Sequence, residues 1–96
     1  MEHENFVLLA QFCKHHAIAD SFVMSLNDHD IIELIEKEDD LYLHIDSIDK
    51  VEKIIRLHID LSINIEGIDV ILQLLDKIQN LEVELKSVKN NLRLTD

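Results

Sequence analysis

The chain has 96 residues and a formal net charge of −11, from 20 acidic and nine basic residues. It contains no proline and a single glycine, which disfavours a turn-rich fold, and its apolar residues are mostly aliphatic, so we expect a mainly helical protein. Such an acidic chain repels phosphate backbones and anionic membranes and favours basic partners. The single cysteine, Cys13, excludes an internal disulfide and fits a reducing compartment. Because there is no long apolar run and no leader, we expect a cytoplasmic protein.

Two short helices are predicted in the first third of the chain. The stretch FVLLAQFCKHH places Leu8, Leu9, Phe12 and Cys13 on one helical face. The residues AIAD interrupt this pattern, and SFVMSLNDHD then predicts a second short helix with Phe22, Val23 and Leu26 facing inward. Two short helices joined by three or four residues predict a helix-turn-helix over residues 6–30.

Residues 31–46 are predicted to form a two-stranded wing. In the second apolar run, Leu41, Leu43 and Ile45 alternate with Tyr42 and His44, which is the pattern of a short strand. The turn between the two runs, residues 36–40, contains no glycine or asparagine to favour a tight two-residue hairpin. We therefore expect a small or irregular wing.

The stretch LHIDLSINIEG, residues 57–67, fits two different structures. Apolar residues at every second position are typical of a half-buried strand. However, Val51, Ile54 and Ile55 fall at helical spacing, and this period continues through Ile59 and Leu61. We therefore predict a third helix over residues 47–62, a short turn, and a C-terminal helix over residues 64–93. The whole chain, residues 1–96, is then a single mainly α domain.

The C-terminal helix carries a heptad pattern that predicts a homodimer. Apolar residues recur at the two core positions of a coiled coil over three heptads, at Ile71, Leu74, Ile78, Leu81, Leu85, Val88 and Leu92. Flanking charges at Lys77, Glu82, Glu84 and Lys89 can pair across either a parallel or an antiparallel dimer, so the orientation stays open.

The residues capable of metal or acid–base chemistry do not form a recognisable site. Cys13, His15 and His16 lie close in sequence, and so do Asp28, His29 and Asp30, but the paired ligand spacing of a structural zinc site is missing. No glycine-rich loop accompanies a nucleophile. We therefore expect no enzyme, no metal and no cofactor.

The predicted helix-turn-helix has the wrong charge for DNA. Between residues 17 and 45, one basic residue, Lys37, stands against eight acidic residues. Phosphate contacts and guanine recognition need lysine and arginine on the second helix and the wing. Direct DNA binding is therefore not expected.

The order of helix-turn-helix, wing, helix and dimerising helix resembles a truncated MerR-type winged helix. More specifically, the chain resembles the small chaperone-modulator proteins of the CbpM type over residues 6–92. The stretches that carry the resemblance are QFCKHHAI, LYLHID and RLHIDLSINIEGIDVILQLLDKI, although Ala17 stands where MerR-type turns usually have glycine. The resemblance implies a regulator that binds the J-domain of a DnaJ-like, curved-DNA-binding co-chaperone and inhibits its action with a DnaK-type chaperone.

An acidic surface suits the basic helix that J-domains carry, so charge and predicted exposure indicate the candidate contacts. The first acidic cluster follows the second helix and comprises Asp28, Asp30, Glu33 and Glu36. The second acidic cluster begins the third helix and comprises Asp46, Asp49 and Glu52, and Tyr42 and His44 are candidates for a less polar centre. Two other functions remain open, a MerR-like transcriptional regulator and a purely structural coiled-coil adaptor.

Overall fold

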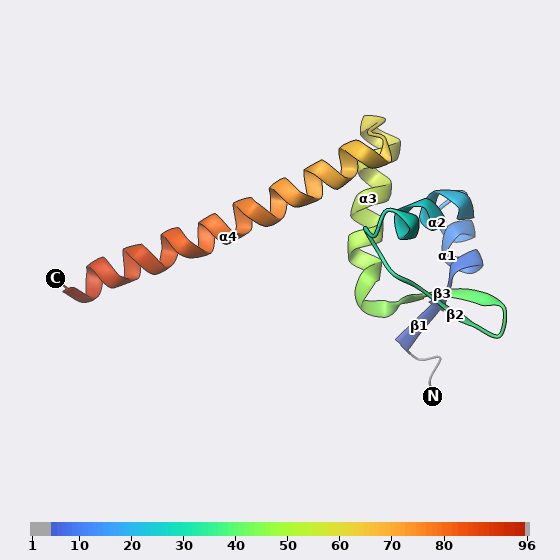
Figure 1. Cartoon of the computed structure of the whole chain (residues 1–96), viewed down its shortest axis with the longest axis horizontal. Coiled ribbons are helices and arrows are strands. Elements are labelled where there is room, and N and C mark those ends of the chain that lie inside the picture. Colours follow the sequence, from blue (N-terminus) through green and yellow to red (C-terminus); the bar gives the residue numbers. More distant parts are fainter. Residues whose placement is uncertain (1–4, 96) are drawn as a thin grey trace. The chain divides into compact units, whose positions relative to one another are not determined.

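The computed structural model describes residues 5–95, with side chains described as far as residue 93, and it divides into two compact units. The first unit, here called the head, extends to Ile65, and the second begins at Glu66. In the head, β1 (Phe6–Leu8), α1 (Leu9–His15), α2 (Asp20–Asp28), β2 (Leu34–Lys37) and β3 (Asp40–His44) are followed by the 3₁₀ turn η2 (Ile45–Ser47) and by α3 (Ile48–Leu61) (Figure 1). The second unit contains α4 (Ile65–Thr95) from its second residue onward. The predicted mainly helical fold with a helix-turn-helix and a wing is confirmed.

The helix-turn-helix consists of α1 and α2, and its turn begins with a residue in the left-handed region. Ala17 has a φ of 52°, the Ile18 amide donates to the Cys13 carbonyl at 3.0 Å, and the Ala17 amide donates to the Lys14 carbonyl at 3.3 Å. These two bonds form a Schellman motif, in which the left-handed position is usually glycine. The turn therefore keeps the geometry that a glycine would allow, with alanine in its place.

Residues 6–8 form a strand, whereas the sequence pattern predicts the start of the first helix. The sheet has the order β1-β3-β2, and β1 pairs with the central strand β3 so that Phe6 faces His44 and Leu8 faces Tyr42. Phe6 and Val7 are residues that favour strands. The wing thus gains a third strand because pairing with a distant segment outweighs the local helical pattern.

The connection between β2 and β3 is a tight two-residue hairpin, a turn that the sequence does not favour, although the wing is small as expected. Lys37 pairs with Asp40, and the two residues between them, Glu38 and Asp39, have φ values of 51° and 70°. Positive φ at both central positions defines a type I′ turn, whose twist matches that of the flanking strands. The strand twist therefore selects this turn even without asparagine or glycine.

The core of the head gathers apolar side chains from all three helices and from the central strand. Leu43 on β3 is fully buried, because a central strand that is covered by helices loses access to water. The other buried side chains of the head are Leu9, Phe12, Cys13, Val23, Leu26, Ile31, Ile32, Val51, Ile54 and Ile55. Burying each large aliphatic side chain contributes roughly 1.5–3 kcal/mol, so this set supplies most of the favourable free energy of folding of the head.

The ambiguous stretch at residues 57–67 is helix, turn and helix, as predicted. α3 ends at Leu61, Ser62 adopts a left-handed conformation with φ 56°, and α4 begins at Ile65. The His58 ring donates from Nδ1 to the Ile63 carbonyl at 2.9 Å, which satisfies a backbone acceptor beyond the end of α3. Among residues 5–95, no helix has both the length and the apolar character needed to cross a bilayer.

Candidate protein-binding surface

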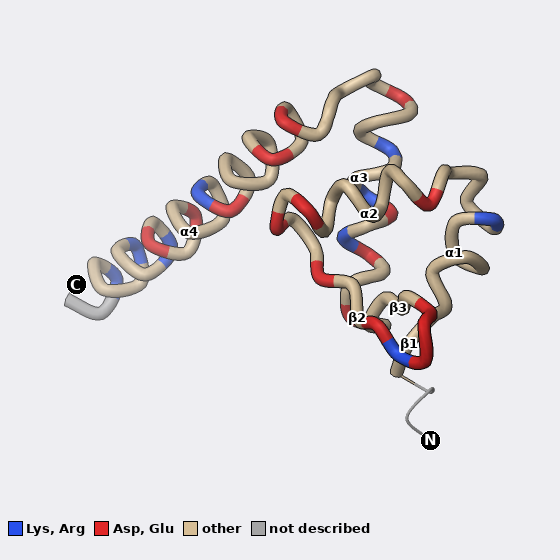
Figure 2. Tube along the Cα trace, turned by 45° about the vertical axis from the view of Figure 1, so that its right-hand side comes forward, with Lys and Arg blue, Asp and Glu red and all other residues tan. Residues whose placement is uncertain are grey.

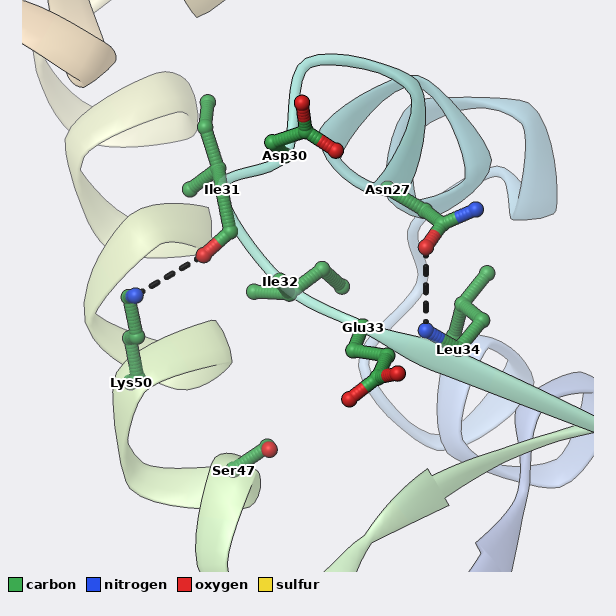
Figure 3. Close-up of a pocket in the computed structure, with 8 residues that line it drawn as sticks. All are labelled: Asn27, Asp30, Ile31, Ile32, Glu33, Leu34, Ser47 and Lys50. Carbon is green, nitrogen blue, oxygen red and sulfur yellow. Dashed lines mark hydrogen bonds between the residues drawn. The ribbon is translucent and has the colours of Figure 1, made fainter.

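The head has a hollow of about 570 Å³ between the end of α2, the segment leading to β2 and the start of α3 (Figure 3). Two hydrogen bonds fix its walls. Asn27 on α2 accepts through Oδ1 from the Leu34 amide at 3.1 Å, and Lys50 on α3 donates from Nζ to the Ile31 carbonyl at 2.8 Å. Asp30 and Glu33 line this hollow with exposed carboxylates. It is therefore a polar recess with an acidic edge.

The structure places the first acidic cluster along one continuous path. Asp28 is the last residue of α2, Asp30 follows it in a left-handed turn with φ 59°, Glu33 precedes β2, and Glu36 lies within β2. All four side chains are exposed. Figure 2 shows acidic residues from the end of α2 through the tip of the hairpin. The segment from α2 to β2 thus carries negative charge along its whole length.

A second hollow adjoins the first one. It is lined by Met24, Asn27, Asp28, Leu34, Glu36, Asp39 and Leu41, and it shares Asn27 and Leu34 with the first hollow. Asp28 and Glu36, from the first acidic cluster, therefore stand beside apolar side chains of α2, β2 and β3. Carboxylates next to partly exposed apolar groups are suited to binding an amphipathic basic partner.

The second acidic cluster lies apart from these hollows. Asp46 is highly exposed, and its Oδ2 lies 3.5 Å from Nδ1 of His44, which also accepts from the Asp46 amide. Asp49 is exposed in the first turn of α3. Glu52 is held by His16, with 3.0 Å between Oε2 and Nε2. None of these three carboxylates lines either hollow, although Ser47 and Lys50 of the same segment line the first one.

Tyr42 and His44 lie on the face of the sheet opposite to Leu41. Alternate residues of a strand point to opposite faces, and Leu41 lines the second hollow. His44 instead packs edge-on against Phe6 of β1, with the ring centroids 5.3 Å apart. The structure therefore does not bring these two side chains together with the first acidic cluster.

Sequence reasoning missed five of the seven residues that line the second hollow, Met24, Asn27, Leu34, Asp39 and Leu41. The sequence did contain a signal for Met24. This residue lies outside the inward-facing set Phe22, Val23 and Leu26 of the predicted second helix, and its side chain is 43% exposed in the structure. Asp39 and Leu41 had no such signal, because their placement depends on how the hairpin packs against α2.

The basic side chains around this surface are already engaged. Nζ of Lys37, on β2, lies 4.2 Å from the centroid of the Phe6 ring in a cation–π contact. Lys50 is bonded to the Ile31 carbonyl. Both lysines keep their positive charge, so these two charges offset only part of the charge of the four carboxylates in the first acidic cluster.

The Cys13 thiol lies in the core of the head. It is 1% exposed, and burial, with a smaller effect of the hydrogen bond to Asp20 and of its charge, raises the pKa of Cys13 to about 12. Such a thiol stays protonated at neutral pH and is a poor nucleophile. Within the described part of the chain, no three histidine, cysteine, aspartate or glutamate side chains gather in a metal-binding arrangement.

The heptad residues of α4 are largely exposed on this helix. Ile71 is half-buried, and the other six, from Leu74 to Leu92, are between 51% and 61% exposed. Exposed aliphatic side chains repeated at seven-residue spacing along one helix are typical of a coiled-coil strand.

Comparison with known proteins assigns the chain at the level of a family. A family model described as "MerR HTH family regulatory protein" matches residues 7–90. No curated protein and no solved structure matches the chain significantly. The match covers the helix-turn-helix, the wing, α3 and most of α4.

Proposed function

Because this chain belongs to the MerR HTH family of regulatory proteins, we propose that it is a non-catalytic regulator that acts by binding another protein through its acidic head. The partner is the J-domain of a DnaJ-like, curved-DNA-binding co-chaperone, as the resemblance to chaperone modulators of the CbpM type implies. Binding there inhibits the action of the co-chaperone with its DnaK-type chaperone.

The observation that carries this proposal is the charge of the helix-turn-helix and the wing. Between residues 17 and 45, which cover most of the helix-turn-helix and the wing, eight acidic residues stand against one basic residue. That basic residue, Lys37, is stacked on Phe6. Such a surface opposes a phosphate backbone and attracts a basic protein helix. A protein partner therefore fits the head better than DNA does.

The exposed heptad residues of α4 support a homodimer as the working form. A helix with this pattern buries its aliphatic residues when two copies pair, and the Lys77, Glu82, Glu84 and Lys89 charges favour pairing. Each dimer then carries two acidic heads.

A MerR-like transcriptional regulator is the alternative, and the family description is compatible with both functions. In that case the acidic head is compatible with DNA only if other residues supply the phosphate contacts. A gel shift at low salt with the promoter of its own gene separates the two functions. Tight binding supports a transcriptional regulator and contradicts the proposal that the acidic head binds a protein.

Calorimetric titration of the protein with the J-domain of a DnaJ-like protein from the same organism tests the main proposal. We expect saturable binding that weakens between low and moderate salt, because exposed charges are screened over about 10 Å at 0.1 M salt. Absence of heat at both salt concentrations, from a protein shown to be folded and dimeric, contradicts the proposal.

A further inference from the structure

A third hollow extends the two already described along the same side of the head. It is lined by residues of β1, α1, α2 and the hairpin, including Leu8, Asp20, Met24, Asp40 and Leu41. It shares Met24, Asp39 and Leu41 with the second hollow, and the second shares Asn27 and Leu34 with the first. The three hollows are therefore neighbours in a row from the start of α3 to the end of β1, and we call this row the groove.

Both apolar side chains and carboxylates line the groove, and we call the apolar ones its floor and the carboxylates its rim. Met24, Leu34 and Leu41 each line two of the three hollows and are partly exposed. Seven different carboxylates line the groove, and its one basic residue, Lys50, is already bonded to the Ile31 carbonyl. A methionine side chain adapts to different apolar surfaces, which suits a floor that receives a partner.

We propose that this groove binds a basic amphipathic helix of a partner protein, with the apolar stripe of the helix on Met24, Leu34 and Leu41 and its lysines or arginines facing the acidic rim. This inference rests on the proposed protein-binding function and names the binding site and the shape of the partner. Recognition of an amphipathic helix by a groove with apolar anchors and charged flanks is a recurring mode of peptide binding.

The edge of the sheet argues for a helix rather than an extended peptide. In the register of the hairpin, the backbone N–H and C=O groups of Leu34 and Glu36 point away from β3. They are therefore the groups that β2 presents at the edge of the sheet. The Leu34 amide is already bonded to Asn27. An extended peptide adding to β2 would thus find one of its two outward amides occupied. The charge of the groove disfavours nucleic acid for the reason given above.

Methionine methyl spectra by NMR provide the direct test. The chain has two methionines, Met1 and Met24, so a sample with labelled methyl groups gives two signals, and Met24→Leu assigns the signal from the groove. The probe is a helical peptide of leucine and lysine, about 18 residues or five turns long, with all leucines on one face. Its control is a scrambled peptide of the same composition without an apolar face.

We expect the amphipathic peptide to shift the Met24 signal in a saturable way and the scrambled peptide to leave it unchanged. Equal shifts with both peptides overturn the inference, because the groove then responds to charge alone. No shift with the amphipathic peptide also overturns it, because the peptide then does not bind near Met24.

Two matched double variants test the rim by fluorescence polarisation of labelled peptide. Asp28→Lys with Glu36→Lys reverses two rim charges, and we expect binding about tenfold weaker or more. Lysine at position 28 suits the end of α2, so this variant should fold. Asp60→Lys with Asp76→Lys changes the net charge equally on exposed residues outside the groove and should change affinity less than about threefold. Equal losses in both variants overturn the inference.

The same variants separate this inference from the proposed function. If the J-domain binds the wild type and the Asp28→Lys, Glu36→Lys variant equally well, the groove is not the site, and the J-domain proposal stands. If the peptide binds in the groove and the J-domain does not bind at all, the J-domain proposal fails, and the groove remains a site for a different basic helix.

Discussion

Ala17 occupies a position at the end of α1 that glycine usually fills. Its φ of 52° is left-handed, which costs a residue with a Cβ atom about 1–2 kcal/mol. The Schellman hydrogen bonds of the turn hold it there. The strain is local and does not involve the groove, because Ala17 does not line any of its three hollows.

Replacing Ala17 with glycine should stabilise the head. We expect Ala17→Gly to raise the free energy of unfolding by about 0.5–1 kcal/mol, since glycine relieves the strain but loses more backbone entropy. Ala10→Gly is the matched control, because Ala10 is an exposed residue inside α1, where glycine costs about 1 kcal/mol. Urea unfolding measures both, and changes of the same sign contradict the prediction.

Cys13 should resist alkylation in the folded protein. Its burial raises the pKa to about 12, so little thiolate is present at pH 8, and access is blocked as well. We expect iodoacetamide to label the folded protein far more slowly than the protein in urea, as measured by mass spectrometry. Equal rates in the two states would show that the core of the head opens readily.

At the scale of single elements, the β2–β3 hairpin makes the clearest stability prediction. Glu38 has a φ of 51° at the first central position of the type I′ turn, where asparagine is favoured. We expect Glu38→Asn to stabilise the head by about 0.5 kcal/mol and Glu38→Val to destabilise it by about 1 kcal/mol, because a β-branched residue tolerates positive φ poorly. Both changes remove the same charge, so thermal unfolding of the pair isolates the conformational effect.

The heptad residues of α4 predict the oligomeric state. We expect Leu81→Asp, at the centre of the heptad pattern, to convert a dimer into a monomer, since it places a charge at a core position. Val83→Asp adds the same charge at an exposed residue outside the pattern and should leave the dimer intact. Sedimentation equilibrium distinguishes the two species, and a wild-type monomer at high concentration rejects the dimer proposal.

The elements differ in how well the sequence predicts them. α2, α3 and α4 follow from helical periodicity, because each carries its own apolar face. β1 does not, since its three residues become a strand only by pairing with β3, some 36 residues further along the chain. The tight hairpin was missed because neither Glu38 nor Asp39 is a usual residue of its turn.

The candidate site shows the same division. Charge alone indicated the first acidic cluster, because four carboxylates close together in sequence stay close on one connecting segment. The apolar floor was not predicted, since Met24 and Leu41 meet only after the hairpin packs beside α2. Local sequence patterns therefore predict the charge of the groove and leave its shape to tertiary packing.

At the scale of the whole molecule, the proposed partner site and the heptad residues belong to different compact units. The groove residues all precede residue 65, whereas the heptad residues lie between residues 71 and 92. Recognition and dimerisation can therefore be disrupted separately by substitution.

This separation predicts the behaviour of a monomeric variant. We expect Ile78→Asp with Leu85→Asp to bind an isolated J-domain with an affinity per head within about threefold of the wild type, while losing avidity for a surface that carries many copies of the co-chaperone. Calorimetry with the isolated J-domain measures the first property, and surface-immobilised full-length co-chaperone the second. Complete loss of binding to the isolated J-domain would instead favour the purely structural coiled-coil adaptor.

The five non-glycine residues with positive φ among residues 5–95 have a consequence for how the stability of the protein could be increased. Asp30, Glu38 and Asp39 are acidic, and only Ala17 and Ser62 are not. A library selected for heat resistance alone would replace all five with glycine or asparagine, and three of these changes would each remove a negative charge from the helix-turn-helix and wing. Such a selection would yield a sturdier head with a weaker attraction for its partner, unless binding were selected in the same experiment. At the three acidic positions, a substitution that raises stability thus also weakens the attraction for the partner. At Ala17 and Ser62, stability can be raised without a change of charge.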